Sequence, residues 1–81
     1  MDSLDVVKGF INMLDGRRPT QVELDRVAPD LDVVYQRFRK AREAGFDIDL
    51  GDDVRALLIR AGKKELEKRA PFAIRRAAGL L

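Results

Sequence analysis

Residues 20–46 read TQVELDRVAPDLDVVYQRFRKAREAGF, and this stretch decides the expected fold. It opens with a capping box, because the Thr20 hydroxyl can accept from the Glu23 backbone N–H while the Glu23 carboxylate reaches back to Thr20. A short helix is therefore expected over about residues 20–28. Pro29 lacks a backbone donor and disfavours helical angles at the residue before it, which predicts that this helix ends there.

A longer helix is expected from Asp30, its N-cap, to about Ala44. Its apolar residues recur at helical spacing and make one inward stripe: Leu31, Val34, Tyr35, Phe38 and Ala41. Gly45 suits a helix end with a left-handed residue, and Phe46 is expected to fold back onto the last turn, as in a Schellman motif. A short capped helix, a tight break and a longer basic helix predict a helix-turn-helix-like core.

The same stretch resembles the loose pattern of winged-helix regulators, in which a recognition helix ends in a Gly followed by an apolar residue, here Gly45 and Phe46. The resemblance implies a DNA-binding regulator. The chain departs from that pattern in the turn, where Ala28-Pro29-Asp30 replaces the usual Gly. Nothing after Phe46 has the pattern of a β-wing.

The segment before this stretch, residues 3–14, also has helical spacing. Its apolar residues cover about half of the expected helix, which is wider than the ~100° stripe of a helix on a one-sided core. Such a helix is either central to the fold or partly an interface. Val6, Phe10 and Met13 lie toward the edge of this apolar face, and they are the candidate residues of a protein interface.

The segments after it are expected to be helical as well. Asp52 or Asp53 should cap a helix that ends near Gly62, followed by a short helix over 63–70 and a last one that starts at Pro71. We therefore expect an all-α, single compact domain of five to six short helices. Residues 1–62 form its helical core, and residues 63–81 form a basic helical segment packed on that core or on a partner. The residues expected in the core are Leu4, Val7, Ile11, Leu24, Val27, Val34, Phe38, Leu57 and Leu58.

The composition narrows the possible functions. The chain has 81 residues with no Cys and no His, which removes the thiol nucleophile, the commonest general base and the commonest metal ligand. The acidic turn over 47–53 departs from a calcium-binding EF-hand loop at three places and favours helix capping instead. We expect no catalytic residue, no metal site and no cofactor, and therefore no enzyme.

The sequence also bears on location. No stretch reaches the roughly 18 consecutive apolar residues of a membrane span. The start of the chain is acidic, whereas a secretory signal begins with basic residues and continues into an apolar run. We expect a cytoplasmic, intracellular protein without a membrane span.

The net charge of +2 conceals an uneven distribution of charge, in which two basic segments flank an acidic one. On the longer helix of the quoted stretch, Gln36, Arg37 and Lys40 share a face away from the apolar stripe. In a major groove, Gln can pair with adenine and Arg or Lys with guanine, so these three are the candidate base contacts. The candidate phosphate contacts are six basic residues outside that helix: Arg17, Arg18, Lys63, Lys64, Arg75 and Arg76.

Two functions remain open on these observations. The first is a small nucleic-acid-binding protein, helix-turn-helix-like, with a regulatory or architectural role. The alternative is a non-catalytic helical adaptor or subunit that docks another protein, or a second copy as a homodimer. It would use the wide apolar face of the first helix and the basic C-terminal segment.

Overall fold

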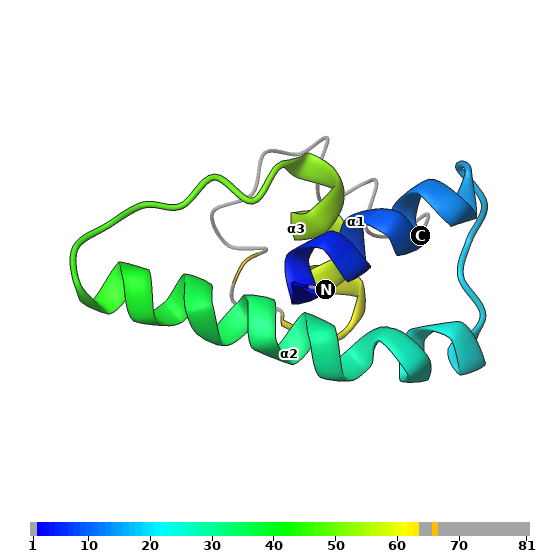
Figure 1. Cartoon of the computed structure of the whole chain (residues 1–81), viewed down its shortest axis with the longest axis horizontal. Coiled ribbons are helices and arrows are strands. Elements are labelled where there is room, and N and C mark those ends of the chain that lie inside the picture. Colours follow the sequence, from blue (N-terminus) through cyan, green and yellow to red (C-terminus); the bar gives the residue numbers. More distant parts are fainter. Residues whose placement is uncertain (1, 64–65, 67–81) are drawn as a thin grey trace.

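The computed structural model describes residues 2–63 and Leu66. This part of the chain holds three α-helices and no strand: α1 (Ser3–Leu14), α2 (Gln21–Glu43) and α3 (Asp52–Arg60). Figure 1 shows α2 running along one side of the molecule, with α1 and α3 both lying on the same side of it. The radius of gyration of 12.0 Å matches the roughly 12 Å of a compact chain of this length. The all-α class and the single compact domain are confirmed.

The first helix, α1, has the bounds that the sequence predicts. Asp2 is its N-cap, and the Asp2 carboxylate accepts a hydrogen bond from the Leu4 N–H at 3.3 Å. Its C-cap is Asp15, which takes a left-handed conformation with φ 48°. Its Val7 side chain is fully buried, because α1 packs against both α2 and α3.

The second helix, α2, runs without a break from Gln21 to Glu43 and contains Pro29. The predicted end at Pro29 is wrong, and so is the N-cap role assigned to Asp30. No turn divides this segment, so the helix-turn-helix core expected here is not formed. Asp30 lies inside α2 and accepts a hydrogen bond from the Ser3 hydroxyl of α1 at 3.0 Å.

The packing of α2 explains why its helix continues through Pro29. Its buried residues follow one stripe in phase on both sides of the proline, at i, i+4, i+7 and i+11: Val27, Leu31, Val34 and Phe38. Full burial of such a side chain contributes roughly 1.5–3 kcal/mol, and the stripe together outweighs the ~3 kcal/mol cost of an internal proline. Pro29 and Asp25 are both exposed, so water can reach the Asp25 carbonyl that lost its helical donor.

The C-terminal end of α2 has the hydrogen bonds of a Schellman motif. The Phe46 N–H donates to the Ala41 carbonyl at 2.8 Å, and the Gly45 N–H donates to the Arg42 carbonyl at 3.0 Å. Gly45 has φ 86°, a conformation that L side chains rarely adopt. The predicted stop at Gly45 is confirmed. The predicted fold-back of the Phe46 side chain is wrong, because that side chain is 70% exposed.

The third helix, α3, begins differently from the expectation. Its N-cap is Gly51, with no side-chain cap, so the capping role predicted for Asp52 or Asp53 is wrong. Both aspartates lie in the first turn, where their charges favour the positive end of the helix dipole. The carboxylate of Asp49 accepts a hydrogen bond from the Gly51 N–H at 2.9 Å and shapes the turn before the helix.

The core joins all three helices, Leu50 and Leu66. Of the nine residues expected in it, six are buried: Val7, Val27, Val34, Phe38, Leu57 and Leu58. The other three, Leu4, Ile11 and Leu24, are partly buried against the cluster. The helices expected over 63–70 and from Pro71 onward fall on residues outside the described part, apart from Lys63 and the buried Leu66.

Candidate interaction surface

The three residues proposed as a protein interface line one groove between α1 and α2. Val6, Phe10 and Met13 lie at i, i+4 and i+7 on α1, so they share one face of that helix. Glu23, Arg26 and Val27 of α2 complete the wall of the groove, which has a volume of about 240 Å³. Met13 is 54% exposed, while Val6 and Phe10 are half-buried. The groove is therefore mainly apolar, with two charged side chains at its α2 wall.

The carboxylate of Glu23 is held by bonds within the protein. The Arg17 guanidinium donates to its two oxygens at 2.8 and 2.6 Å, and the Thr20 N–H donates to Oε1 at 2.9 Å. The hydrogen bond from Arg17, with the one from Thr20, lowers the pKa of Glu23 to about 2. Arg26 has no ion pair within the described part of the chain. The charge left available at this groove is thus positive.

The three candidate base contacts do not share one environment. Arg37 donates to the Asp2 carboxylate at 2.6 Å, which ties α2 to the N-cap of α1. The same hydrogen bond lowers the pKa of Asp2. Gln36 and Lys40 are exposed, and neither makes a side-chain hydrogen bond or ion pair with a described residue. Arg37 would have to leave Asp2 before it could contact a base.

Two of the candidate phosphate contacts are also bound within the protein. Arg17 is held by Glu23, and its exposed side chain forms a two-bond pair. Lys63 lies 3.0 Å from the Asp32 carboxylate and 5.0 Å from the centre of the Tyr35 ring. Arg18 is exposed. Lys64, Arg75 and Arg76 lie outside the described residues.

Sequence reasoning found the α1 half of the groove and missed its α2 half. The signal for Val6, Phe10 and Met13 was an apolar face too wide for one core contact. Arg26 gave no such signal, because its place at the groove follows from the packing of α1 on α2. The Arg17–Glu23 pair could have been predicted from the sequence. In a capping box the Glu23 carboxylate turns back toward the N-cap, and Arg17 lies only three residues before that N-cap.

No matching family model, curated protein or solved structure was found for this chain. Among residues 2–63 and Leu66, no three potential ligand side chains of His, Cys, Asp or Glu gather as a metal site would need. None of the helices described is both long enough and apolar enough to cross a membrane. The groove and the exposed face of α2 are the two candidate interaction surfaces.

Proposed function

We propose that this protein is a non-catalytic helical adaptor that binds a protein partner in the groove between α1 and α2. The observation that supports this proposal is the convergence of Val6, Phe10 and Met13 with the Arg26–Val27 wall of α2. An apolar groove between two helices accepts the apolar face of a third helix. Each half-exposed apolar side chain that the partner covers would add favourable burial.

The charges at the groove select the kind of partner helix. Glu23 is already paired with Arg17 and held by the N-cap of α2, so its charge is compensated. Arg26 is exposed and carries the uncompensated charge. We therefore expect an amphipathic helix with apolar residues at i, i+3 or i+4, and i+7, and with an Asp or Glu placed to reach Arg26.

A displayed library of random peptides tests this proposal. We expect the peptides enriched on the parent protein to carry that apolar spacing together with an acidic residue. Met13→Asp should abolish their binding, because it places a charge in the groove while removing a side chain that is 54% exposed and lies outside the buried core. Arg26→Glu should disfavour the acidic peptides and select basic ones instead.

Phe46→Asp is the matched control, because it introduces the same carboxylate at an exposed apolar residue that does not line the groove. Peptide binding should survive this change. The proposal is wrong if no peptide is enriched, or if the enriched peptides bind the Met13→Asp variant as well as they bind the parent protein.

A second candidate is nucleic-acid binding by the exposed face of α2, without a helix-turn-helix. It is favoured by Gln36 and Lys40, which are one turn apart and have no side-chain partner among the described residues. Both could reach base edges if α2 entered a major groove, with Arg18 on a phosphate. This would be a regulatory or architectural role.

Retention on immobilised duplex DNA tests the second candidate. The parent protein should be retained at about 50 mM salt and released as the salt concentration rises. Lys40→Ala should weaken retention, while the control Lys8→Ala removes an exposed lysine of α1 and should not. If the protein is not retained even at low salt, the nucleic-acid-binding hypothesis is wrong and the adaptor remains the proposed function.

A further inference from the structure

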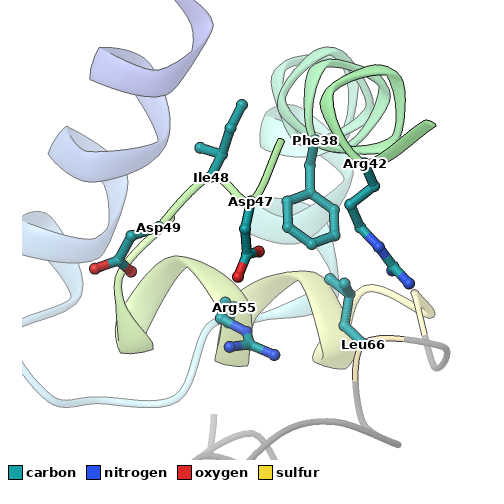
Figure 2. Close-up of a pocket in the computed structure, with 7 residues that line it drawn as sticks. All are labelled: Phe38, Arg42, Asp47, Ile48, Asp49, Arg55 and Leu66. Atoms are coloured by element: carbon teal, nitrogen blue, oxygen red, sulfur yellow. The ribbon is translucent and has the colours of Figure 1, made fainter. Parts of the chain in front are cut away.

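A second cavity lies away from the groove, between the C-terminal part of α2, the loop over 44–51 and α3. Its volume is about 470 Å³, which falls within the roughly 300–1,000 Å³ of small-molecule sites. Figure 2 shows Phe38 and Arg42 extending from α2 and Arg55 from α3, with Leu66 next to Phe38 and Arg42. The cavity thus combines an apolar surface with charged side chains from separate elements.

Two guanidinium groups line the cavity, those of Arg42 and Arg55. The Nε of Arg55 is buried and has no hydrogen-bond acceptor. The Arg42 guanidinium lies over the Phe38 ring, 5.5 Å from the ring centre. Neither arginine forms an ion pair within the described part of the chain. A buried donor without an acceptor is unfavourable. The Arg55 side chain as a whole is only partly buried and lines the cavity, so its guanidinium group can bind an incoming oxyanion.

The loop adds negative charge to the same wall. Asp47 and Asp49 both line the cavity. Asp49 already accepts the Gly51 N–H, whereas Asp47 makes no hydrogen bond with a described residue. In Figure 2, the Asp47 carboxylate lies on the side of the cavity that faces α3 and Arg55, yet no ion pair joins the two. The wall therefore carries charges of both signs, which favours a ligand that also carries both.

We propose that this cavity binds a small zwitterion of the amino-acid class, with its carboxylate at Arg55 and its ammonium group at Asp47. The apolar carbons of the ligand lie against Phe38 and Leu66. This site is independent of the α1/α2 groove, and its occupant would tie the loop over 44–51 to α3. A ligand of few atoms makes few contacts, so binding in the millimolar range is expected.

Three probes with similar carbon skeletons distinguish the contributions of the two charged groups: γ-aminobutyrate carries both, butyrate only the carboxylate, and butylammonium only the ammonium. Each is titrated into the parent protein while the NMR signals of the backbone amides and of the arginine Nε–H groups are followed. We expect saturable shifts of the Arg55 Nε–H and of residues 47–49 with γ-aminobutyrate alone. An absence of saturation up to about 50 mM, far above a millimolar Kd, overturns the proposal. Equal binding of butyrate does so too.

Substitutions assign the two ends of the ligand. Arg55→Gln should weaken γ-aminobutyrate at least about tenfold, because it removes a charge-assisted donor. Asp47→Asn should weaken γ-aminobutyrate but strengthen butyrate, because it removes both the partner of the ammonium and the repulsion of the carboxylate. Arg60→Gln, on the same helix and not lining the cavity, is the matched control and should leave binding unchanged. If Asp47→Asn shifts both affinities in the same direction, the assignment is wrong.

Discussion

Glu23 closes the N-terminal end of α2 and binds the preceding loop with the same carboxylate. The Thr20 hydroxyl accepts from the Glu23 N–H at 3.2 Å, and the Glu23 carboxylate accepts from the Thr20 N–H at 2.9 Å. Arg17 then donates to both carboxylate oxygens. All of the bonds to the carboxylate favour its charged form, which is why the pKa of Glu23 falls from 4.5 to about 2.

This pKa shift predicts a dependence of stability on pH. Because the pKa of Glu23 is lower in the folded state, its contribution is complete above pH 4.5 and is lost as the pH falls from there to about 2. Urea unfolding of the parent protein should therefore give a free energy that declines through this window. Glu23→Gln should flatten the decline, and Arg17→Ala, which keeps the capping box, should flatten it less. Parallel curves for all three proteins would contradict this account.

Local pairs could be read from the sequence, and long-range pairs could not. Thr20 and Glu23 are three residues apart, and the capping box they form is confirmed. Arg37 and Asp2 are on different helices, and their ion pair exists because α1 lies across α2. From the sequence, Arg37 was expected to be available for a base contact, because its residue type does not reveal that it pairs with Asp2 in the folded protein.

At the scale of the element, α2 sets the geometry of the molecule. Its 23 residues carry the buried stripe, the α2 wall of the groove and the exposed Gln36 and Lys40. The sequence rule that a helix ends before proline fails here, because the apolar stripe keeps its phase across Pro29. Local propensity is a weak effect beside the burial of that stripe. The helix termini at Thr20 and Gly45 were predictable, because each has its own local hydrogen bonds.

Pro29→Ala should stabilise the protein. The substitution restores a helical N–H that can donate to the Asp25 carbonyl and removes the clash of the proline ring with that carbonyl. The expected gain is about 1–3 kcal/mol, reduced somewhat because alanine leaves the unfolded chain more flexible. Chemical denaturation of the two proteins measures it. A loss of stability would mean that the segment does not pass through Pro29 as a regular helix.

At the scale of the whole molecule, the core depends on α3 although α3 has only nine residues. Five of its residues are buried, and Leu57 and Leu58 are fully so. The sequence predicted these two leucines from their helical spacing. Ile59 is buried as well, because α3 is covered on more than one face. The extent of burial around a short helix depends on its neighbours, which periodicity does not specify.

Leu57→Ala should cost about 2–5 kcal/mol, as expected for a fully buried leucine. Leu24→Ala is the comparison, because Leu24 is only partly buried at the edge of the core and should cost less. The urea unfolding midpoints of both variants show which substitution destabilises the protein more. Equal losses would mean that the core does not centre on α3 as described.

The central claim is that residues 21–43 form one continuous helix. No helix-turn-helix is then formed there, and α2 supplies one wall of the groove that we propose binds a helical partner. Backbone Cα secondary chemical shifts measured by NMR test it most directly, because they report helical conformation residue by residue. The structure predicts positive values without interruption from Gln21 to Glu43, including both neighbours of Pro29. Values that fall to zero around Pro29 and recover from Leu31 would contradict the claim and restore two separate helices.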